Sequence, residues 1–327
     1  MSLNSEGVYH PQRLLDGIRA CDKRSLARAI SFVENDPWQS RSLINQLYLD
    51  NMLGRADIIG ITGPPGAGKS TLTGKLIKHL RAQDKTVGVV LIDPSSPFTG
   101  GAILGDRVRM SESNTDPGVF IRSMGSRGHL GGLALATQDT VALMDAYGFD
   151  IILIETVGIG QAETEIVATA DMTIVIAVPG LGDEIQIIKA GIMEIGDIFV
   201  VNKADRDGAS KVATEIKMML DMVQQGNLRP VVLNTIANRD QGIEELMNEI
   251  FARLTLLNDE QIMIRRRENR LWQTVAQSLQ SQVAFRLNPI LQSEAKNGIL
   301  ERIKRGESSP YQEAQVLLTQ LAMLIMN

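Results

Sequence analysis

A glycine-rich segment that ends in a lysine and a serine carries the clearest chemical signal in this sequence. The segment is Gly63-Pro64-Pro65-Gly66-Ala67-Gly68-Lys69-Ser70, and Thr71 follows it. A β-branched run over 57–62 precedes it, and the apolar spacing of 71–80 predicts a helix. Strand, glycine-rich turn and helix in this order are typical of a phosphate-binding loop, although an ordinary strand-to-helix turn with a lysine is the alternative.

The chemistry of such a loop assigns a role to each part of the segment. Its backbone N–H groups and the start of the following helix would surround the phosphates, so we expect 63–71 to bind a nucleotide. Lys69 would reach the β- and γ-phosphates, and the Ser70 hydroxyl would bind Mg²⁺. The sequence therefore predicts a site for a nucleoside triphosphate.

A second polar motif, Asn202-Lys203-Ala204-Asp205, directly follows the predicted strand 198–201. A carboxylate at this position can accept hydrogen bonds from two neighbouring N–H groups of guanine, and adenine has no such pair of donors. We therefore expect Asp205 to select GTP, Lys203 to lie across the base and Asn202 to tie this loop to the phosphate loop. After the last predicted strand, 230–233, a second base-contacting loop is expected at Asn234, Thr235 and Ile236.

Two acidic residues, Asp93 and Glu155, end the predicted strands 86–92 and 149–154. A carboxylate at such a strand end can hold Mg²⁺ through water, and a following N–H group, here that of Gly158, can bond the γ-phosphate. Simple capping of the strand ends is the alternative for both acidic residues. Because glutamate replaces the usual aspartate at position 155, its longer side chain should change the geometry around the metal.

The residue after Gly158 is Ile159, where Ras-type GTPases place the glutamine that orients the attacking water. An apolar side chain cannot position water, so we expect slow hydrolysis of GTP to GDP and phosphate unless a partner completes the site. Lys69, Glu155 and Gly158 are the expected catalytic groups.

The elements around these motifs predict an α/β fold, a P-loop G domain with a mostly parallel sheet between helices. Strand and helix patterns alternate over 56–256. Residues 1–55 predict a helical N-terminal extension with helices at 11–33 and 37–52, a loosely held arm being the alternative.

Residues 257–327 predict a helical C-terminal extension. An apolar residue recurs there every four positions and forms one helical stripe, which Pro289 is expected to interrupt; the stripe consists of Leu271, Val275, Leu279, Val283 and Leu287. We interpret this extension as a homodimerisation arm. The alternative is that it covers the sheet of its own subunit.

Composition limits the remaining possibilities. The chain has 327 residues, of which 44% are hydrophobic and 22% charged, as expected of a globular protein. Its net charge of -5 argues against a nucleic-acid partner. Cys21 is the only cysteine, so no intramolecular disulfide is expected. The sequence shows neither a signal peptide nor an apolar run of roughly 20 residues, so we expect a cytoplasmic protein without a membrane partner.

Five motifs together resemble the MeaB/ArgK-type G-protein chaperones of methylmalonyl-CoA mutase, and the resemblance extends along essentially the whole chain. They are GPPGAGKS at 63–70, LIDPSSPFTGGAILGDRVRM at 91–110, ETVGIGQAE at 155–163, VPGLGDEIQ at 178–186 and NKAD at 202–205. The long second motif and the glutamate of the third are far more specific than the phosphate loop, which many proteins share.

This resemblance implies a homodimeric GTPase whose partner is an adenosylcobalamin-dependent methylmalonyl-CoA mutase. GTP binding and hydrolysis would gate the loading of the cobalamin cofactor and would protect or rescue the mutase. The resemblance also implies that Asp93, Asp106 and Glu155 serve Mg²⁺ and the switches. A third switch would include Asp183, Gln186 and Lys189.

Three other functions fit the sequence less well. A kinase or ATPase linked to amino-acid transport would need a general base and an acceptor pocket, but the three histidines, His10, His79 and His129, are scattered. A metal-insertion GTPase for nickel would need a cluster of histidines and cysteines, which this composition cannot easily supply. A purely structural interaction module would leave the conjunction of nucleotide motifs without a purpose.

Overall fold

The computed structural model of the 327-residue chain describes residues 10–93, 115–125, 130–156, 158, 169–180, 192–223, 229–259, 261–291 and 295–326. The chain forms two compact units, residues 1–270 and residues 271–327, and each is described by itself.

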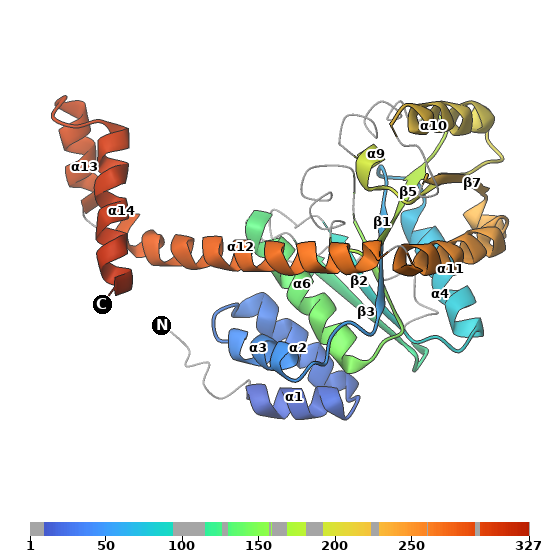
Figure 1. Cartoon of the computed structure of the whole chain (residues 1–327), viewed down its shortest axis with the longest axis horizontal. Coiled ribbons are helices and arrows are strands. Elements are labelled where there is room, and N and C mark those ends of the chain that lie inside the picture. Colours follow the sequence, from blue (N-terminus) through green and yellow to red (C-terminus); the bar gives the residue numbers. More distant parts are fainter. Residues whose placement is uncertain are drawn as a thin grey trace. The chain divides into compact units, whose positions relative to one another are not determined.

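The first unit is built on a seven-stranded parallel sheet with the strand order β3-β2-β4-β1-β5-β6-β7 (Figure 1). This confirms the predicted α/β class. The strand β1 lies in the middle of the sheet, where the order changes direction, and such a position is where open α/β sheets bind ligands. The strands are β1 (Asp57–Thr62), β2 (Val87–Asp93), β3 (Val119–Gly125), β4 (Ile151–Glu155), β5 (Met172–Ala177), β6 (Ile198–Asn202) and β7 (Val231–Thr235).

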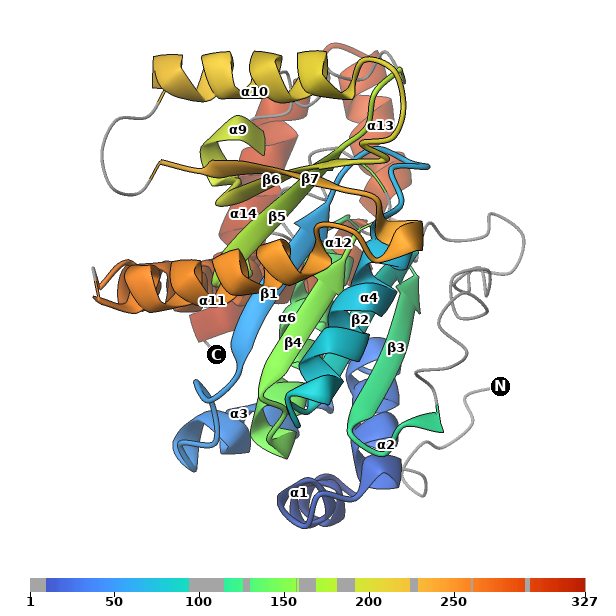
Figure 2. The ribbon, with the colours of Figure 1, turned by 90° about the vertical axis from the view of Figure 1, so that its right-hand side faces the viewer.

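Helices cover both faces of this sheet, because successive apolar residues of each strand point to opposite sides. In β1, for example, Ile59 and Ile61 pack in one core and Ile58 in the other. The first core includes α4 (Lys69–Ala82) and α11 (Ile243–Asp259), which lie over one face in Figure 2. The other face is covered by α6 (Leu130–Tyr147), by the N-terminal helices and, over β5 and β6, by α10 (Ala209–Val223). Two short helices, α9 (Ile192–Ile195) and η3 (Ala237–Arg239), lie in connections.

The N-terminal extension contains three helices rather than the two predicted: α1 (Pro11–Arg19), α2 (Lys23–Asn35) and α3 (Arg41–Leu49). The prediction of one helix over 11–33 was wrong because Cys21 has a left-handed backbone, with φ 54°. Asp22 then caps α2 by accepting hydrogen bonds from the N–H groups of Arg24 and Ser25, at 3.2 and 2.9 Å. The three helices share the core of α6, so this extension is an integral part of the first unit.

A group of ion pairs ties the start of α12 (Ile262–Leu291) to the end of the sheet where β5 and β6 begin. The carboxylate of Asp171, just before β5, is fully buried and binds the guanidinium groups of Arg267, at 2.8 Å, and Arg270, at 3.2 Å. Asp197, just before β6, binds Arg266 through two contacts of 2.9 and 2.8 Å. Because a buried carboxylate is costly without partners, these arginines fix the start of α12 to the sheet.

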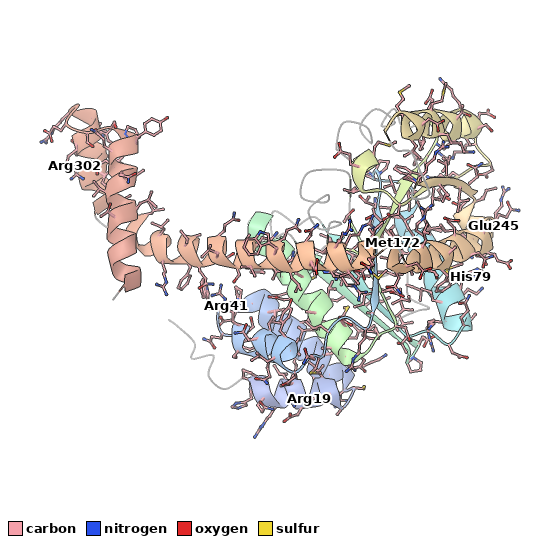
Figure 3. The ribbon with its side chains drawn as sticks, viewed as in Figure 1. Arg19, Arg41, His79, Met172, Glu245 and Arg302 are labelled. Atoms are coloured by element: carbon pink, nitrogen blue, oxygen red, sulfur yellow. The ribbon has the colours of Figure 1, made fainter. Side chains whose placement is uncertain are left out.

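The second unit contains the remainder of α12 with α13 (Ala295–Lys304) and α14 (Pro310–Met326). The ion pair between Arg302 and Glu313, at 2.7 Å, joins α13 to α14; Arg302 is labelled in Figure 3. The expected interruption at Pro289 was wrong, because α12 continues to Leu291. Proline removes one helical hydrogen bond, and here the helix ends only two residues later. Among the described residues, no helix is both long and apolar enough to cross a membrane.

The packing of α6 against the N-terminal helices generates a prediction about pH. Burial raises the pKa of the Asp139 carboxyl to about 7, while the positive charge of Arg41 opposes this rise. Arg41, labelled in Figure 3, also stacks its guanidinium 3.7 Å from the centre of the Trp38 ring. An unfolded aspartate releases its proton near pH 4. Between about pH 4 and 7 the native state therefore keeps a proton on Asp139 that the unfolded state has lost. The contribution of Asp139 to stability is therefore lost as the pH rises through that window.

The amide of Asp139→Asn stays neutral at every pH. We expect the unfolding free energy of this variant, relative to that of wild type, to increase by roughly 1–3 kcal/mol from pH 5 to pH 8. Urea denaturation at several pH values would measure it. Asp259→Asn, at an exposed position, is the matched control for the lost carboxylate. A difference between Asp139→Asn and wild type that does not change with pH would contradict the assignment.

Candidate functional site

The phosphate-loop segment 63–68 connects β1 to α4 at the carboxyl end of the sheet, and two of its three glycines with positive φ also lie against other segments. Gly63 has φ 152°, and a Cβ there would lie 2.4 Å from the carbonyl oxygen of Ile176 in β5. Gly68 has φ 90°, and its Cβ would lie 2.4 Å from Nδ2 of Asn202. Any side chain at either position would force the loop away from β5 or from Asn202.

Lys69 is the first residue of α4, and its buried side chain turns back across the loop. Its Nζ donates hydrogen bonds to the carbonyl oxygens of Gly63, at 2.8 Å, and Pro64, at 3.1 Å. The first N–H groups of α4 have no partner within the helix and carry the positive end of its dipole. The ammonium and the helix start therefore make this loop suited to binding an anion such as a phosphate.

The first two turns of α4 hold the side chain of Glu155, which ends β4. The hydroxyl of Ser70 donates to Glu155 Oε1 at 2.6 Å, and the hydroxyl of Thr73 donates to Oε2 at 2.7 Å. Glu155 is only 4% exposed, so this cluster lies at the bottom of the site. Hydroxyl and carboxylate oxygens are the ligands that Mg²⁺ prefers, and those of Ser70 and Glu155 fit such an ion.

Asn202 joins the loop after β6 to two other segments. Its Nδ2 donates to the carbonyl oxygen of Ala67 at 2.8 Å. Its Oδ1 accepts hydrogen bonds from the Thr235 hydroxyl and from the Ala237 N–H group, both at 3.1 Å. The structure thus brings the NKAD loop, the phosphate loop and the loop after β7 together through one buried amide.

The two charged residues of the NKAD loop also have defined partners. Lys203 has a left-handed backbone, with φ 57°, and its Nζ donates to the carbonyl oxygen of Gly66 at 2.7 Å. Asp205 is partly exposed and forms a 3.5 Å ion pair with Arg239 of η3. In the loop after β7, Thr235 is buried, Asn234 is exposed and Ile236 pairs with Gln241.

Gly158 lies beside the phosphate loop, since a Cβ added to it would be 3.9 Å from the ring of Pro65. Its carbonyl oxygen accepts a hydrogen bond of 3.1 Å from the hydroxyl of Thr62, the last residue of β1. Several predicted residues lie outside the described part of the chain, namely Asp106, Ile159, Asp183, Gln186, Lys189 and the side chain of Asp93.

Sequence reasoning missed Thr73 and Arg239. Thr73 stands three positions after Ser70, so helical spacing alone could have placed both hydroxyls on one face of α4. No sequence pattern indicates Arg239, because its approach to Asp205 depends on the turn η3.

Comparisons with known proteins identify the family of this chain. Residues 26–289 match the family described as methylmalonyl Co-A mutase-associated GTPase MeaB. A putative GTPase of Pyrococcus abyssi is 44% identical over 312 residues, covering 94% of this chain and 96% of that protein. The GTPase ArgK of Escherichia coli is 37% identical over 248 residues, covering 73% and 75%. The mouse protein named methylmalonic aciduria type A homolog, mitochondrial, is 33% identical over 328 residues, covering 93% and 77%.

A solved structure titled LAO/AO transport system kinase matches the full length of both chains with a TM-score of 0.68 and 24% sequence identity, which shows a shared fold. The family match spans most of this sequence, and relatives more than 30% identical cover it almost completely. The chain therefore belongs to the MeaB family of methylmalonyl Co-A mutase-associated GTPases.

Proposed function

We propose that this protein is a Mg²⁺-dependent GTPase that acts as a chaperone of an adenosylcobalamin-dependent methylmalonyl-CoA mutase. It would gate the loading of cobalamin and would protect or rescue the mutase. The observation that carries the proposal is the hydrogen bond from Asn202 to Ala67, which holds the NKAD loop against the phosphate loop. Membership of a mutase-associated GTPase family supports the choice of partner.

In the proposed reaction, water attacks the γ-phosphate of GTP in line with the leaving GDP. The ammonium of Lys69 and the first N–H groups of α4 stabilise the charge that develops on the phosphate oxygens. Mg²⁺, when bound, would neutralise part of the phosphate charge, and Ser70 and Glu155 are the described residues that would hold it. The third switch at Asp183, Gln186 and Lys189, and the roles of Asp93 and Asp106, belong to the proposal.

Guanine selection is assigned to Asp205. Its carboxylate would accept hydrogen bonds from two N–H groups of guanine in place of its contact with Arg239. Loss of the ion pair between Asp205 and Arg239 costs little free energy, because its atoms are 3.5 Å apart and Arg239 is well exposed.

We expect Asp205→Asn to weaken GDP and GTP binding by at least about tenfold, because the charge-assisted acceptor is lost. The amide can donate to the 2-oxo group of xanthine, so binding of xanthosine nucleotides should strengthen. Competition against a fluorescent guanine nucleotide measures both affinities. Asp207→Asn, an exposed aspartate two residues away, is the control. Unchanged GTP affinity in Asp205→Asn would refute the assignment of the base contact.

We expect the purified protein to release phosphate from GTP slowly and a cognate mutase to accelerate this release, because Ile159 cannot orient water. A phosphate-release assay with and without the mutase tests this, with Lys69→Ala as the inactive control. A pull-down in GDP and then in a non-hydrolysable GTP analogue would show which nucleotide state binds the mutase. Fast turnover that is equal with and without mutase, or transfer of phosphate to another acceptor, would overturn the proposal.

The homodimer is also a proposal, and the apolar stripe of α12 supports it. Leu271, Val275 and Leu279 are 48%, 56% and 61% exposed, although apolar side chains at helical spacing favour a buried contact. We assign this stripe to the contact with a second copy of the chain.

We expect the wild-type protein to sediment as a dimer and the double variant Val275→Glu, Leu279→Glu to sediment as a monomer, because charges would be buried in the contact. Analytical ultracentrifugation is the measurement. Gln280→Glu, an exposed position beside the stripe, should remain dimeric. A monomeric wild type, or a double variant that stays dimeric, would reject this assignment.

A further inference from the structure

We propose that Thr73 is a positioning residue whose hydroxyl fixes the Glu155 carboxylate for Mg²⁺. The inference rests on the proposed function, since it concerns the metal that would accompany GTP. It adds a residue outside the phosphate-loop motif, which ends at Ser70. Thr73 lies one helical turn beyond that motif, on the same face of α4.

The first support is the symmetry of the contacts. Each oxygen of Glu155 accepts a hydrogen bond from a hydroxyl of the same helix, Ser70 at 2.6 Å and Thr73 at 2.7 Å. Thr73 is fully buried and Glu155 nearly so, so water does not compete strongly for these bonds. Hydrogen bonds to an ionised acceptor are about twice as strong as neutral ones.

The second support is a contrast with Thr214 and Thr255, whose hydroxyls donate to the backbone of their own helix. Thr214 and Thr255 donate to the carbonyl oxygen four residues earlier, at 2.8 and 2.9 Å. Thr73 has the same carbonyl available, that of Lys69 at 3.0 Å. Its single hydroxyl proton has a shorter path to the charged oxygen of Glu155, so the carboxylate is the favoured acceptor.

The two hydroxyls then have different tasks. The Ser70 oxygen can bind Mg²⁺ with a lone pair while its proton still points at Glu155. Thr73 stands one turn further from the phosphate loop and restrains the other carboxylate oxygen. Glutamate has one more rotatable bond than aspartate, so more side-chain freedom must be removed to fix its carboxylate. Thr73 adds a restraint at Oε2, as partners behind a metal site commonly do.

The test compares nucleotide binding by the full-length protein in EDTA and in a titration of Mg²⁺, using a fluorescent GDP. Mg²⁺ should increase the affinity for GDP. We expect Thr73→Val to raise about tenfold the Mg²⁺ concentration at which this increase is half-maximal, and to leave the GDP affinity in EDTA unchanged. Thr73→Ser, which keeps the hydroxyl, should match wild type. Thr214→Val removes an equivalent helical hydroxyl far from Glu155 in sequence and should also match wild type.

A double-mutant cycle gives a second measurement. Aspartate at position 155 is too short to reach both hydroxyls, so Thr73→Val should change the Mg²⁺ dependence less than twofold in a Glu155→Asp background. Thermal unfolding without nucleotide or metal checks that each variant is folded. If Thr73→Val does not fold, Thr73→Ala takes its place.

The outcomes separate this inference from the proposed function. An unshifted Mg²⁺ dependence in Thr73→Val, or a Thr73→Ser variant that behaves like valine, would overturn the role of Thr73 alone. A wild-type protein whose binding of guanine nucleotide is insensitive to Mg²⁺ would overturn both.

Discussion

The side-chain amide of Asn202 joins three segments that are more than thirty residues apart in the sequence. Because a buried amide is costly when its groups have no partner, the positions of these segments are coupled. Ala67 in the phosphate loop cannot move without breaking the bond to Nδ2, and the loop after β7 is held through Oδ1. Glycine at position 68 is part of the same constraint, since a side chain there would collide with the amide. The NKAD loop, the phosphate loop and the loop after β7 are therefore held together at this amide.

A second constraint acts at the bottom of the site, where β4 delivers a carboxylate to the first two turns of α4. The contacts of Ser70 and Thr73 with Glu155 link helix to strand directly beneath the loop. Lys69 meanwhile bonds to carbonyl oxygens of its own loop. The buried ammonium, hydroxyl and carboxylate groups therefore all have hydrogen-bond partners within the site, as the burial of polar groups requires.

The fold class and the phosphate loop could be predicted because their signals are local: glycine spacing, apolar runs and helical periodicity. The helix break at Cys21 could not, since a left-handed cysteine leaves no mark in the sequence. The predicted interruption at Pro289 was wrong because a proline is tolerated when only a few residues of the helix follow it. The partners of Thr73, Arg239 and the arginines at the start of α12 depend on tertiary contacts between distant segments, which composition and spacing do not encode.

The anchoring of α12 at Asp171 and Asp197 has a mechanical consequence. These aspartates immediately precede β5 and β6, and the opposite ends of the same strands approach Gly63 and include Asn202. An extended strand is close to its maximum length and can hardly stretch. A pull on the start of α12 would load β5 and β6 lengthwise, against the hydrogen bonds of their neighbours on both sides. The sheet would then carry the force as tension, and the nucleotide loops would be displaced only if the strands slid as a whole.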